Sequence, residues 1–167
     1  LQFVVRRFGL PMDSMRNRGF KIKPYALANG RDIYTLATWN GTAFESLGLS
    51  LFMQEMQQQG WRENFENSVE AMLDFSSQHS LPGLLSEAYS GNGTEYTGNI
   101  GIPALALNDK PRITDAPSLY SLGAAYAIAP DSVERFLGVN REQIEALFTD
   151  HGPWEGYNTT QHSAIEF

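Results

Sequence analysis

Two short segments of the chain each place one glutamate among aromatic and small residues. Residues 85–89 read Leu-Ser-Glu-Ala-Tyr, and residues 152–157 read Gly-Pro-Trp-Glu-Gly-Tyr. Cleavage of a glycosidic bond needs one protonated carboxyl, which donates to the leaving oxygen, and one ionised carboxylate, which attacks or activates water. The pattern therefore predicts Glu87 and Glu155 as a catalytic pair. The alternative is that both are loop glutamates that cap or pair with neighbouring groups.

The two glutamates are expected to play different parts. A carboxyl that packs against an aromatic ring has its neutral form favoured by desolvation, which raises its pKa. We expect Glu155 to be the general acid and Glu87 the nucleophile or base. The reverse assignment stays open, because the sequence does not order the two roles.

Six further residues are predicted to contact a sugar. The flat apolar faces of tryptophan and tyrosine suit sugar rings, so aromatic residues near the glutamates are expected to line the site. Glu45 also fits a capping box at the start of a helix, and Asp115 fits an N-cap that can hydrogen-bond a sugar hydroxyl. The predicted substrate-binding residues are Trp39, Glu45, Tyr89, Asp115, Trp154 and Tyr157.

Composition excludes several other classes of site and partner. The chain of 167 residues contains no cysteine, which excludes disulfides and thiolate metal sites. Its three histidines lack metal-ligand spacing, so neither a metal ion nor another cofactor is expected. A net charge of −7 disfavours nucleic acid and anionic membranes as partners. The longest weakly polar run, residues 119–129, is too short to span a bilayer.

A serine hydrolase is a formal alternative to the paired carboxylates. Ser86, His151 and Asp115 could supply its nucleophile, base and orienting acid. The sequence lacks the Gly-x-Ser-x-Gly turn that presents such a serine between a strand and a helix. The glycosidase hypothesis is therefore preferred.

Helical periodicity dominates the chain after residue 40 and predicts a mainly all-α fold. Apolar residues recur at helical spacing over 42–58 and over 62–78, with Gly60 between the two stretches. This pattern predicts an antiparallel helix hairpin. The residues expected to pack it together are Phe44, Leu51, Phe65 and Leu73.

The remaining elements are expected to be shorter. A third helix is predicted to begin at Asp115 and continue through Tyr126, followed by helices over 131–137 and 140–150. Strands are expected only over 1–8 and 20–36. The segment 81–112 is rich in glycine and asparagine, and its length and its aromatic residues favour an ordered, functional loop.

The chain resembles the bacterial glucoamylase-like domain found in cyclic β-1,2-glucan synthases and in related proteins of unassigned activity. Residues 39–45, Trp-Asn-Gly-Thr-Ala-Phe-Glu, are similar to a family segment that opens a helix. Four further segments occur in the family's order at similar spacing. They are residues 86–89, 101–105, 116–118 and 154–157.

The resemblance implies an (α/α)6 toroid whose helix hairpins carry long functional loops around a funnel for sugar. About half of such a toroid fits in this length, so residues 1–167 are interpreted as a single partial domain, the C-terminal part of the toroid. Residues 1–37 are interpreted as a lead-in segment with short strands. The rest of the toroid is expected to come from the same protein or from another chain.

The resemblance also implies two candidate functions. In the first, the chain is part of a glycoside hydrolase or transglycosylase that acts on a bacterial glucan. In the second, it is a non-catalytic carbohydrate-binding or scaffold relative. Either reading implies an oligo- or polysaccharide partner and a periplasmic or secreted location. Three Asn-x-Thr sequons, at residues 40, 92 and 158, are compatible with export.

Overall fold

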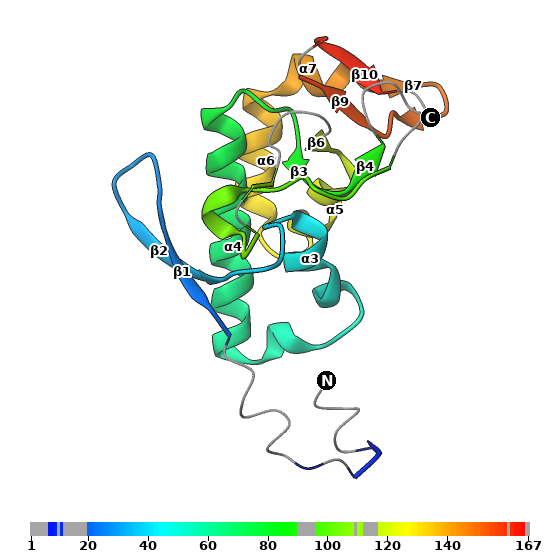
Figure 1. Ribbon diagram of the computed structural model, residues 1–167. Coiled ribbons are helices and arrows are strands. Elements are labelled where there is room, and N and C mark those ends of the chain that lie inside the picture. The colour runs from blue at the N-terminus through cyan, green and yellow to red at the C-terminus, as the bar shows by residue number, and fades with distance from the viewer. Residues whose placement is uncertain are drawn as a thin grey trace.

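The protein is described by a computed structural model over residues 7–9, 11, 20–89, 96–108, 110–111, 117–159 and 161–165. These residues form helices and ten short strands, and the strands pair into four antiparallel sheets (Figure 1). The fold is mixed α/β, so the predicted mainly all-α fold is wrong. Glycine and proline interrupt the helical pattern in the second half of the chain, and short strands form there and pair with one another.

A β-hairpin opens the described part of the chain. Strands β1 (Ile22–Ala26) and β2 (Asp32–Leu36) pair in antiparallel register, as expected of strands within 20–36. Tyr25 and Ile33 point inward and are buried. The Tyr25 hydroxyl donates to Asp74 Oδ2 at 3.1 Å, and the amide of Ala28 donates to Asp74 Oδ1 at 3.1 Å. These two bonds attach the hairpin to the long central helix.

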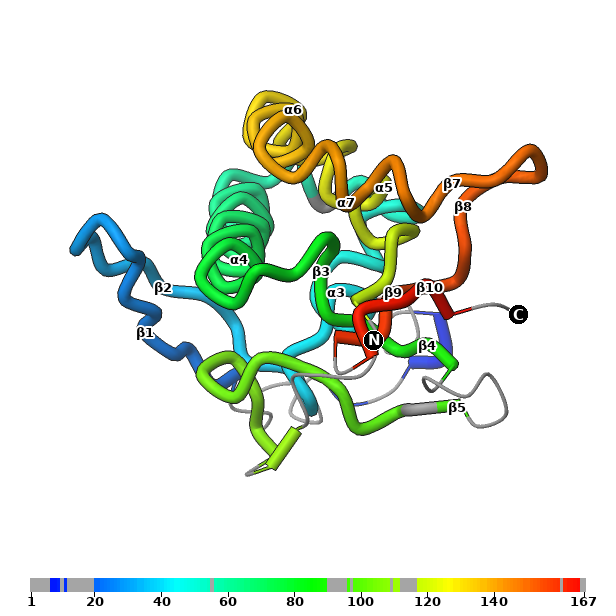
Figure 2. The backbone as a smooth tube through the Cα atoms, turned by 90° about the horizontal axis from the view of Figure 1, so that it is seen from above, coloured from blue at the N-terminus to red at the C-terminus, as the bar shows by residue number. Residues whose placement is uncertain are grey.

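That central helix, α4 (Gln59–Gln78), confirms the helix predicted over 62–78. It buries Phe65, Val69, Met72 and Leu73, which recur at helical spacing along one face. It contacts β2, β3 and α6, and Figure 2 looks along α4 and α6 where they lie side by side. Gly60 lies in the first turn of α4, so it does not separate two helices as predicted.

The helix predicted over 42–58 is wrong. The segment forms α3 (Ala43–Leu47), then two 3₁₀ turns, η1 (Gly48–Leu51) and η2 (Glu55–Gln57). Phe44 is 60% exposed and Leu51 is 52% exposed, so neither packs in a hairpin core. Gly48 weakens helix propagation at the point where α3 ends. The capping prediction is confirmed at Thr42, whose hydroxyl accepts the amide of Glu45 at 3.1 Å.

Three helices follow in the second half of the chain. They are α5 (Tyr120–Tyr126), α6 (Pro130–Val139) and α7 (Arg141–Glu145). The predicted start of α5 at Asp115 is wrong, because the helix begins at Tyr120 with Leu119 at its N-cap. The helix expected over 131–137 is confirmed as α6. The helix expected over 140–150 is only α7, and β7 (Phe148–Thr149) pairs with β8 (Gly152–Pro153) after it.

The largest sheet brings distant segments together. Its strand order is β10 (Ser163–Ile165), β9 (Gly156–Asn158), β6 (Pro117–Ser118) and β3 (Leu84–Leu85). Ser118 pairs with Leu84 on one side and with Gly156 on the other. Next to this sheet, β4 (Ala88–Tyr89) pairs with β5 (Tyr96–Thr97). Segment 81–112 therefore contains short strands in its described part, together with η3 (Pro103–Leu105).

Two glycines allow the segment before α3 to lie directly against the segment before η3. A Cβ at Gly101 would lie 1.8 Å from the backbone oxygen of Asn40, and one at Gly41 would lie 2.6 Å from the oxygen of Ile102. Gly41 also has a φ of +72°, which side chains rarely adopt. Asn40 Nδ2 donates to the Gly98 oxygen at 2.7 Å and completes the junction.

Replacement of Gly101 by alanine should destabilise the fold by roughly 1–3 kcal/mol or more, because the new Cβ would displace the Asn40 backbone. Gly98→Ala is the matched control, since no atom lies within 4 Å of a Cβ built there. The free energies of unfolding in urea measure both effects. Equal stability of the two variants would contradict the close contact.

Candidate active site

The four-stranded sheet places both predicted catalytic glutamates beside one strand. Glu87 follows β3 after a single intervening residue, and Glu155 directly precedes β9. Strands β3 and β9 are the two neighbours of β6. Glycine and proline around Glu155 keep that segment out of a helix, and the glutamate lies in a bend directly before β9. The pairing brings together segments that are far apart in the sequence.

Two hydroxyl groups orient the Glu87 carboxylate. Thr42 Oγ1 donates to Glu87 Oε1 at 3.0 Å, and Ser86 Oγ donates to Oε2 at 3.2 Å. Thr42 is itself the N-cap of α3, so the helix start and the glutamate share one hydroxyl. The Glu87 side chain is half-buried, and each of its two carboxylate oxygens accepts one of these hydrogen bonds.

Ser86 connects three elements beneath Glu87. It is completely buried, and its hydroxyl accepts the amide of Phe44 at 3.1 Å. The hydroxyl of Tyr120, at the start of α5, lies 2.7 Å from Ser86 Oγ and donates to the backbone oxygen of Glu87 at 3.1 Å. The network fixes Glu87 relative to both α3 and α5.

The serine-hydrolase alternative gains no support from this arrangement. The hydrogen bonds of Ser86 within the described residues involve Glu87, Phe44 and Tyr120, and none involves a histidine. His151 is exposed in the turn between β7 and β8. Asp115, also predicted to bind substrate, lies outside the described residues.

Glu155 has a different environment from Glu87. Its side chain is half-buried, and burial raises the pKa of its carboxyl above the ordinary value. A raised pKa keeps a larger fraction of the group protonated, which suits a proton donor. The desolvation expected from the sequence is therefore present at Glu155.

The charges of both glutamates raise the pKa values of two tyrosines, Tyr96 and Tyr120. Burial raises the pKa of the Tyr96 phenol, and the charges of Glu87 and Glu155 raise it further. Burial also raises the pKa of Tyr120, the hydrogen bond between Tyr120 and Ser86 opposes this, and the charges of Glu87 and Glu155 again raise it. The two glutamates are thus among the causes of both pKa shifts. The convergence of Glu87 and Glu155 across one cleft stays a prediction.

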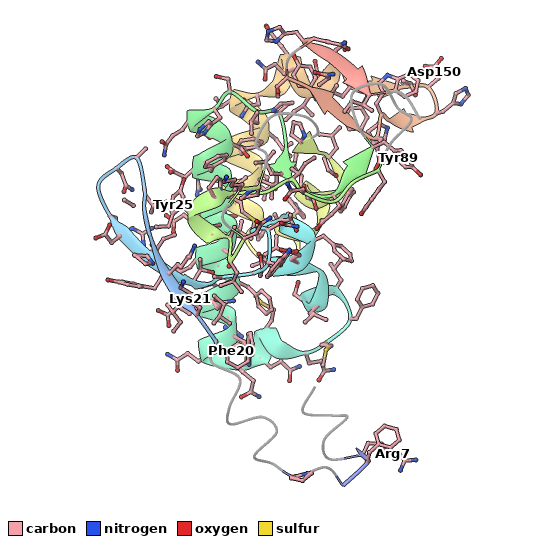
Figure 3. The ribbon with its side chains drawn as sticks, viewed as in Figure 1. Arg7, Phe20, Lys21, Tyr25, Tyr89 and Asp150 are labelled. Atoms are coloured by element: carbon pink, nitrogen blue, oxygen red, sulfur yellow. The ribbon has the colours of Figure 1, made fainter. Side chains whose placement is uncertain are left out.

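Of the predicted aromatic residues, Tyr89 is the one attached to this tyrosine pair. Its ring meets that of Tyr96 edge-on, with ring centroids 6.0 Å apart, and Figure 3 shows it on β4. Trp39 is 65% exposed beside the glycine junction. Trp154 and Tyr157 are half-buried on either side of Glu155. That Trp39, Trp154 and Tyr157 line the same cleft as Tyr89 stays a prediction.

Glu45 lies at the edge of the same hydrogen-bond network. Its carboxylate accepts the backbone amide of Asn40 at 2.8 Å, and its own amide donates to the Thr42 hydroxyl that also binds Glu87. The capping interpretation therefore holds for Thr42, while the Glu45 carboxylate bonds to the turn before the helix. Its side chain is half-buried.

The sequence did not indicate two residues of the network, Thr42 and Tyr120, as parts of the site. The sequence did contain a signal for Thr42, because an N-cap threonine accepts an amide of the first helical turn and still has its own hydroxyl proton to donate. No sequence signal marked Tyr120, because its position beside Ser86 depends on the pairing of β3 with β6.

No metal or membrane-spanning element accompanies the site in the part of the chain that the structure describes. No group of three or more metal-binding side chains occurs there. Likewise, none of the helices in these ranges has the length and apolar character needed to cross a bilayer.

Two solved structures share the fold of this chain. The structure matches the endo-β-1,2-glucanase of Talaromyces funiculosus, both in complex with sophorose and as a glutamate-to-glutamine variant with β-1,2-glucan. In both comparisons the TM-score is 0.73 at 16% identity, with 88% of this chain and 30% of the glucanase covered. The chain thus spans about a third of the length of these structures. No family model and no curated protein matches the sequence.

The shared position of the two carboxylates can be tested by titration. Replacing either Glu87 or Glu155 by glutamine should lower the pKa values of both Tyr96 and Tyr120, because loss of a negative charge makes each phenol easier to ionise. Carbon NMR of labelled tyrosine rings measures these values. Tyr126, whose pKa is raised mainly by its hydrogen bond to Glu134, should not change and serves as the control. A variant that shifts only one of the two phenols would contradict convergence.

Proposed function

We propose that this chain is the part of a glycoside hydrolase that carries paired carboxylates, and that its substrate is a β-glucan with β-1,2 linkages as the first candidate. The observation that carries the proposal is the position of Glu87 and Glu155 next to β3 and β9, the two strands that flank β6. The fold shared with endo-β-1,2-glucanases, known with sophorose and with β-1,2-glucan, supports the choice of substrate.

The two environments suit the two halves of the reaction. Glu155, whose pKa is raised by burial, would give its proton to the glycosidic oxygen as the bond to the anomeric carbon breaks. Glu87, held by Thr42 and Ser86, would attack the anomeric carbon or take a proton from the attacking water. A sugar hydroxyl in place of water would give transglycosylation. Tyr89 and Tyr96 would carry the sugar ring.

A second candidate is a carbohydrate-binding or scaffold role without turnover. In this role the tyrosines would still hold a sugar, and the two glutamates would act only as hydrogen-bond acceptors. Both candidates take a neutral oligo- or polysaccharide as partner and place the chain in the periplasm or outside the cell.

We further propose that another part of a larger assembly, from the same protein or another chain, covers one apolar surface. The surface runs through α3, η1 and the turn after it, and it consists of Phe44, Leu49, Leu51, Phe52 and Met53. All five side chains are exposed, with Phe52 at 85%. Contiguous apolar surface of this kind marks interaction sites in proteins.

The catalytic proposal predicts that Glu87→Gln and Glu155→Gln each reduce turnover of β-1,2-glucan by about 100-fold or more, because each removes a group that transfers a proton or attacks. Glu134→Gln is the matched control, since Glu134 is a carboxylate bonded to a tyrosine away from the site. Activity is measured by product release from β-1,2-, β-1,3-, β-1,4- and α-1,4-glucans in the full-length protein, and circular dichroism checks folding.

Each outcome of this assay separates the candidates. Cleavage that depends on both glutamates supports the hydrolase. Binding of glucan without product, unchanged in the Glu87→Gln variant, would overturn the hydrolase and support the scaffold role.

The covered-surface proposal predicts that residues 1–167 self-associate when they are expressed alone, and that Phe52→Ser reduces this association. Val139→Ser is the matched control, because Val139 is equally exposed at 85% but lies at the end of α6, outside the surface. Light scattering and sedimentation measure the oligomeric state. A monodisperse monomer that unfolds cooperatively would contradict the proposal.

A further inference from the structure

A cavity lies between β2 and the first half of α4, and neither Glu87 nor Glu155 lines it. Its volume is about 540 Å³, which is within the usual range for small-molecule sites. Figure 3 shows Phe20, one of its lining residues, near the lower end of α4, whereas Tyr89 lies on the opposite side of the molecule. Its lining includes Phe20, Tyr34, Trp61, Asn64 and Asn67.

Aromatic rings form one wall of this cavity. Trp61 stacks on Phe65, with centroids 6.1 Å apart, and Phe65 is buried in the core. Phe20 meets Trp61 edge-on at 6.2 Å. Trp61 nevertheless remains 38% exposed, so a ligand can reach a ring that the core holds in place. Tyr34, on β2, is 59% exposed and also lines the cavity.

Two asparagine side chains in the lining are held by opposite ends of their amide groups, Asn64 by its oxygen and Asn67 by its nitrogen. Asn64 Oδ1 accepts hydrogen bonds from Thr35 Oγ1 at 3.2 Å and from the amide of Leu36 at 2.8 Å. Asn67 Nδ2 donates to the backbone oxygen of Tyr34 at 2.9 Å. Among the described residues, the Asn64 amino group and the Asn67 oxygen have no further partner. The cavity therefore offers one fixed donor and one fixed acceptor.

The charged groups of the lining disfavour an anionic ligand. Asp32 and Glu63 contribute two carboxylates, and the guanidinium of Arg31 is paired with Glu70. A wholly apolar partner would leave these polar groups buried without hydrogen bonds, which is costly. A neutral sugar satisfies both requirements, since its hydroxyls can bond to the amides and carboxylates while its C–H face covers Trp61.

We propose that this cavity is a second binding site, for a neutral oligosaccharide stacked on Trp61. The site shares no residue with the proposed active site and does not depend on Glu87 or Glu155. Its occupant would be a remote part of the same glucan or a separate chain of it.

The proposal is tested by titrating the full chain with sophorose and with cellobiose in the Glu87→Gln background, where hydrolysis is blocked. Amide NMR shifts should change at residues 31–36 and 60–67. Trp61→Ala should weaken binding at these residues by about tenfold, and Trp61→Phe should restore part of it. Tyr34→Ala, on an exposed strand residue, is a second variant that leaves the core intact.

Three results would overturn the proposal. The first is an absence of shifts at residues 31–36 and 60–67 with either sugar. The second is unchanged affinity in both Trp61→Ala and Tyr34→Ala, provided that circular dichroism shows both variants folded. The third is a change of oligomeric state in Trp61→Ala, which would show that another protein surface fills the cavity. Loss of activity in Glu87→Gln bears only on the active site, so the two proposals fail separately.

Discussion

The pairing of β6 with both β3 and β9 is the interaction on which the candidate site depends. Ser118 bonds through its backbone to the strand that leads to Glu87 and to the strand that begins after Glu155. Neither strand is long enough to be stable alone, because isolated pairs of this length are marginal in water. The helices α4 and α5 pack against β3 and supply the burial that holds these short pairings in place.

A single sheet gives the two glutamates distinct environments. Glu87 is oriented by hydroxyls of Thr42 and Ser86, whereas Glu155 lies where burial raises its pKa. Both still act on the phenols of Tyr96 and Tyr120. Acid and base work on one bond requires two carboxyls in different environments, which is why we propose this role for Glu87 and Glu155. The Thr42 hydroxyl has two roles, because it caps α3 and orients Glu87 at the same time.

The surface carries two features that the site does not use. The apolar surface around Phe52 consists of five exposed apolar side chains, so it suits another protein surface. The cavity around Trp61 mixes aromatic rings with fixed amides and carboxylates, so it suits a sugar. Because the apolar surface and the cavity differ in polarity, we propose different occupants for them. Both lie in a chain that corresponds to about a third of its structural neighbours.

The sequence by itself determined the strongly local features. The apolar spacing in α4 and α6, the cap at Thr42 and the hairpin within 20–36 follow from contacts between residues close in the chain. Glu87 and Glu155 were proposed from residue type and neighbours, because a carboxyl is the group that this chemistry requires, and their catalytic role stays a prediction. Only the tertiary structure decided the mixed α/β fold, the outward position of Phe44 and Leu51, and the role of Tyr120. Two-residue strands have no periodicity to detect, and their partners are set by long-range packing that no local pattern encodes.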